Sequence, residues 1–267
     1  MPFASVAGVN LYYETHGEGS PLLLITGLGG SCRGWLALQV PAFATAHRTV
    51  IYDHRGVGES EDRGQPYSIG DLADDAAALL ESLGIERAHV LGSFMGGMVA
   101  QELALRHPER VDRLVLVGTY ARPDAKRRLL IETWLDLAQQ KAPPERLLRE
   151  RVLWTLTDET FEQRDLIERM LAGYRDEGFP LSFENLERQC HACLAHDTAE
   201  RLPDLSHPTL VVCGEQDALT PPRLHRALVS SLSDAHLVTI PSAAHLVMVE
   251  AAERFNDAVL QFLSEAR

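Results

Sequence analysis

Short apolar runs alternate with amphipathic segments along most of this chain, and this alternation constrains the fold more than any other feature. Continuous apolar runs bounded by glycine or aspartate are typical of strands buried on both faces, and they occur at residues 22–25, 49–52, 89–91, 114–117 and 210–212. Residues 68–83 place apolar side chains at helical spacing, and Ser68 followed by Asp71 is the signature of a capping box. Alternating strands and helices predict an α/β fold with a mostly parallel central sheet and helices on both faces.

The alternation is interrupted in the middle of the chain. Residues 121–202 contain helical stripes, one of them around Leu129 and Trp134 and another around Leu148 and Leu153, but no convincing strand. We therefore predict a helical cap at residues 121–202, inserted into a core made of residues 1–120 and 203–267.

The charge composition excludes several classes of partner. The 267 residues contain 25 Lys and Arg against 38 Asp and Glu, which gives a formal net charge of −13. Nucleic-acid binding needs clustered basic residues, and an anionic membrane surface repels an acidic chain. Four scattered cysteines do not make a disulfide framework, and the first residues lack the pattern of a signal peptide. We expect a cytoplasmic protein that binds neither nucleic acid nor membrane, and the sequence leaves its oligomeric state open.

Polar or glycine-rich loops follow three of the predicted strands. Thr26-Gly27-Leu28-Gly29-Gly30 follows the first parallel strand, Asp217 follows the strand at 210–212, and His245 follows an apolar run at 237–240. Open α/β sheets place their ligands at the carboxyl ends of the strands, so these loops should converge. A carboxylate beside a histidine fixes the tautomer of the imidazole and prepares it as a general base.

These motifs together resemble the α/β-hydrolases, the group that holds esterases, enol-lactonases and related small-molecule hydrolases. The matching residues span nearly the whole chain and comprise Gly27-Leu28-Gly29-Gly30, Asp53-His54-Arg55-Gly56-Val57-Gly58-Glu59-Ser60, the turn at residues 92–97, Gly214-Glu215-Gln216-Asp217, and His245. The resemblance implies that His245 is the catalytic base and Asp217 its orienting acid. It also implies that the backbone N–H groups of Leu28 and Met95 form an oxyanion hole and that the partner is a small molecule with a carbonyl group. The sequence has no glycine-rich phosphate loop followed by Lys-Ser/Thr, so we expect no cofactor, and we expect no metal.

The position of the family's nucleophile holds a residue that cannot react. The family places a nucleophile at the centre of a Gly-x-Nuc-x-Gly turn, and here the window reads Gly92-Ser93-Phe94-Met95-Gly96. A phenyl ring cannot attack a carbonyl, so we expect Phe94 to line the substrate pocket together with Gly27 and Trp35. Ser93 is the alternative nucleophile, but a shift of the window by one residue puts large side chains where the turn needs glycine.

The catalytic groups that the resemblance leaves in place, a His–Asp pair and an oxyanion hole, favour hydrolysis without a covalent intermediate. A His–Asp base and an oxyanion hole suit direct attack by water on an activated ester, a lactone or a related C–O or C–N bond. Non-hydrolytic chemistry of a lyase, cyclase or decarboxylase type remains open because the same base could remove a proton next to a carbonyl. A ligand-binding protein without catalytic activity is a third possibility.

Other reactive residue types have structural explanations. We expect Cys32 to border the pocket without acting as the nucleophile, and the Cys190–Cys193 pair to pack inside a helix. Arg55 is expected to bond backbone atoms, and Asp71 and Asp75 to lie on a solvated helix start.

Overall fold

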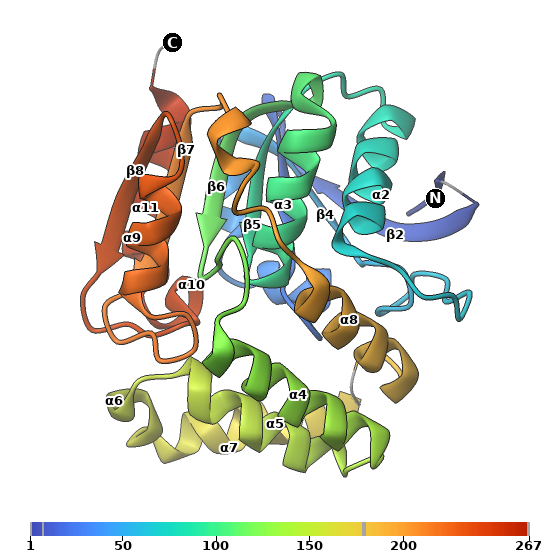
Figure 1. The fold of residues 1–267 in the computed structure, drawn as a ribbon, viewed down its shortest axis with the longest axis vertical. Coiled ribbons are helices and arrows are strands. Elements are labelled where there is room, and N and C mark those ends of the chain that lie inside the picture. Colours follow the sequence, from blue (N-terminus) through green and yellow to red (C-terminus); the bar gives the residue numbers. More distant parts are fainter. Residues whose placement is uncertain (1, 7, 178–179, 266–267) are drawn as a thin grey trace.

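In the computed structural model, eight strands form one sheet in the order β1-β2-β4-β3-β5-β6-β7-β8 (Figure 1). The structure describes residues 2–6, 8–177 and 180–265. β1 pairs antiparallel with β2 and β2 with β4, and every later pairing is parallel. The strands are β1 (Phe3–Val6), β2 (Val9–His16), β3 (Ser20–Ile25), β4 (His47–Tyr52), β5 (Ala88–Ser93), β6 (Val111–Val117), β7 (Thr209–Gly214) and β8 (Ala235–Ile240). The predicted α/β fold with a mostly parallel sheet is confirmed.

Helices cover both faces of the sheet because the strands alternate their side chains between two cores. In β3, Leu23 and Ile25 face one core, while Leu22 and Leu24 face the other. The first core is closed by α2 (Ile69–Ser82), α3 (Met95–Arg106) and α9 (Pro222–Ser230), and the second by α1 (Val40–Phe43), α10 (Val247–Glu250) and α11 (Ala252–Ser264).

The capping box predicted at the start of α2 is present in the structure. The Ser68 side chain accepts from the Asp71 N–H, and the Asp71 side chain accepts from the Ser68 N–H, so the capping box is complete. Asp75 was predicted to lie on a solvated helix start, and this prediction was wrong because Asp75 is buried. Its carboxylate accepts two hydrogen bonds from Arg55, at 2.7 and 2.6 Å, so Arg55 bonds this side chain and not the backbone as expected.

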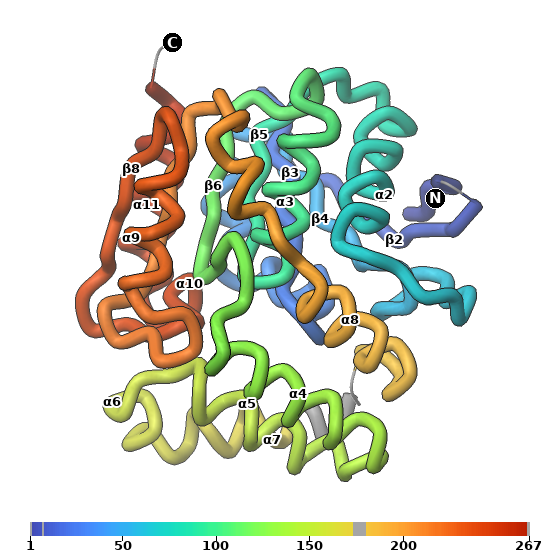
Figure 2. Tube along the Cα trace, in the orientation of Figure 1, coloured from blue at the N-terminus to red at the C-terminus, as the bar shows by residue number. Residues whose placement is uncertain are grey.

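Among the described residues, five α-helices lie between β6 and β7 and gather at one end of the sheet (Figures 1 and 2). They are α4 (Ala125–Gln139), α5 (Pro144–Thr155), α6 (Asp158–Phe161), α7 (Arg164–Glu177) and α8 (Phe183–Ala195). The boundaries of the cap at residues 121 and 202 stay a prediction. Within the insertion, Leu129 and Leu153 were expected in the apolar stripes but are 66% and 62% exposed, because α4 and α5 bury a neighbouring face.

No helix in the described part of the chain is long and apolar enough to cross a membrane.

Candidate active site

The turn between β5 and α3 keeps a strained conformation around Phe94. Phe94 has φ of 49° and ψ of −108°, a region that costs a non-glycine residue about 1–3 kcal/mol. Its N–H donates to the carbonyl of Val117 at 2.9 Å. A Cβ on Gly92 would overlap the backbone of Gly96, so the two backbone segments approach closely only because residue 92 is glycine. The predicted sharp strand-to-helix turn is therefore present, with a phenyl group at its tip.

The ring of Phe94 lies against the imidazole of His245. The two ring centroids are 5.4 Å apart and the planes meet at 82°, an edge-to-face arrangement. Tyr120 and Trp134 contact the same phenyl ring at centroid distances of 6.0 and 6.5 Å. Phe94 is 5% exposed and lines a cavity, and its role in a substrate pocket stays a prediction.

His245 and Asp217 meet on loops that follow β8 and β7. Nδ1 of His245 lies 2.9 Å from Oδ2 of Asp217, and because an ionised carboxylate only accepts, the imidazole donates. The ring is thereby held with Nε2 as its basic nitrogen. Both residues are buried, at 4% and 3% exposure, and His245 lines the same cavity as Phe94.

Thr220 completes this arrangement, and the sequence reasoning missed it. Its N–H donates to Asp217 Oδ1 at 2.7 Å and its hydroxyl donates to Oδ2 at 2.7 Å. Burial alone raises the pKa of Asp217, but the neighbouring His245 and the bonds from Thr220 outweigh it, so the pKa is lowered overall. The spacing Asp217-x-x-Thr220 is the local signal that could have revealed this partner, since side chains of this kind bond backbone N–H groups three residues on.

The glycine-rich loop after β3 lines the cavity. Gly30 N–H donates to Gly27 carbonyl at 3.1 Å, which closes a turn, and Gly29 N–H donates to Oε1 of Gln189 in α8 at 2.7 Å. Leu28 lies between Gly27 and Gly29 and lines the cavity. Met95 is the first residue of α3, so its N–H has no acceptor within the helix.

These loops and the helical insertion enclose a cavity of about 300 Å³. Of the residues expected at the site, Gly27, Leu28, Trp35, Ser93, Phe94 and His245 line it. From the insertion, Trp134, Leu148, Arg151, Val152, Thr155 and Met170 contribute. Most of this lining is apolar, which suits a small, partly apolar molecule.

Two other candidate nucleophiles are placed differently. Ser93 is 7% exposed and lines the cavity, but within the described residues its hydroxyl makes no hydrogen bond to His245. Cys32 is fully buried and its N–H donates to Asp53 at 2.7 Å. Burial and the nearby Asp53 raise the pKa of the Cys32 thiol, so it stays protonated and unreactive. Cys190 and Cys193 are buried in α8 as expected.

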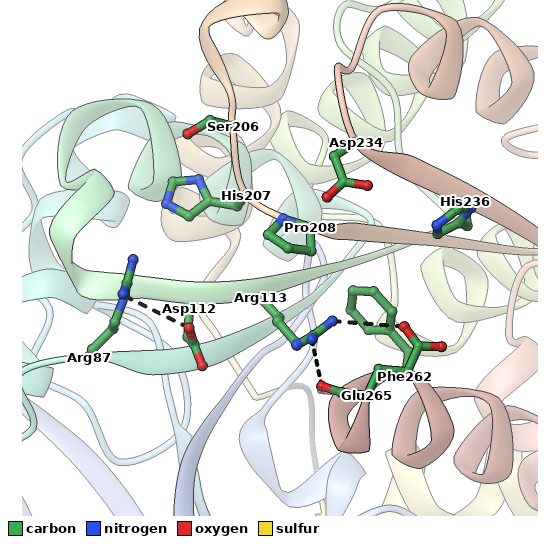
Figure 3. Close-up of a pocket in the computed structure, with 10 residues that line it drawn as sticks. All are labelled: Arg87, Asp112, Arg113, Ser206, His207, Pro208, Asp234, His236, Phe262 and Glu265. Atoms are coloured by element: carbon green, nitrogen blue, oxygen red, sulfur yellow. Dashed lines mark hydrogen bonds and ion pairs between the residues drawn. The ribbon is translucent and has the colours of Figure 1, made fainter. Parts of the chain in front are cut away.

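A second cavity, of about 500 Å³, lies at the opposite edge of the sheet, where β6, β7 and β8 begin (Figure 3). Its arginines are paired with acids: Arg87 Nε is 3.9 Å from Asp112 Oδ1, and Arg113 Nη1 is 3.9 Å from Glu265 Oε2. Arg113 also donates to the Glu265 carbonyl at 2.7 Å and covers Phe262. These contacts tie the last helix to the strand ends. Across the described residues no group of three or more His, Cys, Asp or Glu is placed to hold a metal ion.

Comparison with known proteins agrees with this geometry. The family described as alpha/beta hydrolase fold matches residues 20–252. The chain belongs to this family. RutD of Azorhizobium caulinodans, whose assignment as a carbamate hydrolase is provisional, is 34% identical over 270 residues, which cover 99% of each chain.

Solved structures extend the similarity to three dimensions. The enol-lactonase from Burkholderia xenovorans LB400 is 30% identical with a TM-score of 0.85, covering 99% of this chain and 100% of that one. A hydrolase from Pseudomonas aeruginosa PA01 is 30% identical with a TM-score of 0.88, covering 98% of both chains. These matches place the protein among the α/β-hydrolase-fold hydrolases of small molecules.

Proposed function

We propose that this protein hydrolyses a small carbonyl compound by direct attack of a water molecule, without an acyl-enzyme. The observation that carries the proposal is the His245–Asp217 pair, bonded at 2.9 Å, whose imidazole lines the cavity beside the ring of Phe94. The base of a hydrolase is kept, while the residue that would form the covalent intermediate is replaced by a side chain without a nucleophilic atom.

In the proposed reaction, His245 carries the proton from water to the leaving group, and two backbone N–H groups hold the oxyanion. His245 Nε2 takes a proton from water as the water oxygen bonds to the carbonyl carbon, and the carbonyl oxygen becomes an oxyanion held by the N–H groups of Leu28 and Met95. The tetrahedral species then collapses, its bond to the leaving group breaks, and His245 returns the proton to that group. A general base contributes roughly 10²–10⁴-fold and one oxyanion donor roughly 10²–10³-fold.

A serine-reactive fluorophosphonate, followed by intact mass and peptide mapping, tests the covalent alternative without knowledge of the substrate. We expect no label. A His245-dependent label on Ser93 would show that the turn delivers that hydroxyl to the base, and direct water attack would be wrong.

A panel of activated esters and lactones tests the reaction class. We expect turnover of at least one compound, lost in His245→Ala and kept in His236→Ala, a matched control because His236 lies exposed at the other edge of the sheet. Exchange of a substrate proton with deuterated water while esters stay intact would point to a lyase or cyclase. Ligand-induced thermal stabilisation with no chemistry would point to a binding protein.

A further inference from the structure

The loop that carries His245 is held by hydrogen bonds from the backbone N–H groups on both sides of the histidine. Leu246 N–H donates to the carbonyl oxygen of Thr155, the last residue of α5, at 3.0 Å. Ala244 N–H donates to Oε2 of Glu250 at 2.7 Å. One of these two acceptors belongs to the helical insertion, and the other is a side chain at the end of α10.

The second carboxylate oxygen of Glu250 connects the same loop to α6 of the insertion. Oε1 accepts from the N–H of Thr157 at 2.8 Å, from its hydroxyl at 3.0 Å and from the hydroxyl of Thr160 at 2.6 Å. Both threonines are buried, and Thr157 is the N-cap of α6. Hydrogen bonds to an ionised carboxylate are about twice as strong as neutral ones, so this single side chain joins the insertion to the His245 loop.

The backbone of this loop is strained, so it needs such restraints. Ser242 has φ of 56°, in the left-handed region, and a non-glycine residue stays there only where the surrounding structure enforces it. Leu246 also packs against a cluster of apolar side chains inside the insertion, namely Leu148, Val152, Leu156 and Leu171. The position of His245 therefore depends on the inserted helices as well as on the sheet.

Building on the proposed function, we propose that Glu250 is a positioning residue through which the inserted helices hold His245 against Asp217. The bond of 2.9 Å between His245 Nδ1 and Asp217 Oδ2 requires the loops after β8 and β7 to stay in a fixed relation. Thr155 and Leu246 both line the cavity and are bonded to each other, so the wall that would contact the substrate is continuous with the loop of the base. A displacement of the insertion would misplace the imidazole.

Glu250→Gln tests the connection at nearly constant side-chain size. A glutamine amide has one acceptor oxygen and a donor NH2 group, so it cannot accept from Ala244 and from Thr157 on its two sides at once. 15N NMR of histidine-labelled protein reads both ring nitrogens of His245 through the carbon-bound ring protons, and so reports the bond to Asp217 without any substrate. We expect Glu250→Gln to shift the Nδ1 signal and to speed hydrogen exchange of the Ala244 amide about 10- to 100-fold, the range given by one charge-assisted hydrogen bond.

Thr160→Val tests the part that the insertion plays, because it removes only a hydroxyl of α6 that donates to Glu250. We expect it to move the His245 signal in the same direction as Glu250→Gln, but less far, since the other donors remain. Two exposed residues provide matched controls. Glu253→Gln makes the same change of charge at the start of α11, and Thr133→Val removes a hydroxyl that bonds only within α4. Both controls should leave the signal where it is in the natural protein.

Thermal unfolding checks that each variant is folded at the temperature of the spectra. The proposal is overturned if folded Glu250→Gln leaves the Nδ1 signal of His245 unchanged, or if Glu253→Gln moves it as far. It is also overturned if Thr160→Val has no effect, because Glu250 would then brace the loop without the insertion.

Turnover of activated esters separates this inference from the proposed function. For an ester that the natural protein hydrolyses, Glu250→Gln should lower kcat about 10-fold and change KM by less than about twofold, because the base is displaced and the binding wall is kept. If Glu250→Gln moves the His245 signal but the natural protein hydrolyses no ester, the connection stands and the hydrolytic proposal fails. If an ester is hydrolysed and Glu250→Gln changes neither kcat nor the signal, hydrolysis stands and the role of Glu250 is refuted.

Discussion

Replacing Phe94 with serine asks whether the turn still directs its central residue at the base. The backbone at Phe94 has φ of 49° and ψ of −108°, and its ring centroid is 5.4 Å from that of His245. A hydroxyl on the same Cβ would thus lie on the imidazole side of the turn. We expect Phe94→Ser to react covalently with a fluorophosphonate and to hydrolyse activated esters through an acyl-enzyme.

The expected magnitudes follow from the contacts of the ring. Removing a buried phenyl group costs about 3–5 kcal/mol, and we expect the lower end of that range because one side of this ring borders a cavity. The positive φ imposes similar strain on phenylalanine and serine, so it changes little. Labelling should be about 10²–10⁴-fold faster in Phe94→Ser than in a double variant that also carries His245→Ala, which is the range for a general base.

Intact-protein mass over time measures the labelling rate, and thermal unfolding checks that each variant is folded. Phe94→Ala is the matched control, since it opens the same space without supplying a hydroxyl, and it should stay unlabelled. A folded Phe94→Ser that is not labelled, or is labelled equally without His245, would refute the conclusion that the turn aims at the base.

Three further outcomes follow from the buried polar groups. Thr220→Val removes the hydroxyl that donates to Asp217 at 2.7 Å, so kcat/KM should fall about 10-fold and Thr220→Ser should restore it; an unchanged value would contradict the positioning role. Asp75→Asn leaves the Arg55 guanidinium, 20% exposed, without its charge partner, and urea unfolding should show a loss of about 3 kcal/mol; a loss below about 1 kcal/mol would count against the pair. Burial lowers the pKa of three histidines to about 4, namely His54, His196 and His225. Because their pKa in the unfolded chain is about 6.5, the unfolded state binds protons first as pH falls, and the stability present above about pH 6.5 is lost toward about pH 4. At about pH 5 each of these histidines should lower the free energy of unfolding by about 2 kcal/mol. Unfolding free energies that stay constant between about pH 7 and pH 5 would contradict this.

The sequence alone predicted the elements whose signals are local. The capping box at Ser68 and the apolar runs of the parallel strands involve neighbours within a few residues, so they can be recognised without knowing the fold. Hydrophobic stripes were less reliable on the insertion, where Leu129 and Leu153 face solvent. Helix packing there decides which side of a weakly amphipathic helix is covered, and the sequence does not specify the partner.

Only the tertiary structure brings together residues that are far apart in the chain. Arg151 bonds Leu28 across a sequence separation of 123 residues, and Arg55 bonds Asp75 across 20 residues. Neither pair can be recognised from the spacing of nearby residues. The sequence predicted that Phe94 stands where the family has its nucleophile, and its contact with His245 depends on how β5 and β8 pack in one sheet. Local propensity and motif spacing predicted the fold and named His245 and Asp217 as candidate partners, whereas their hydrogen bond and the lining and shape of the cavity were decided by long-range packing between strands, loops and inserted helices.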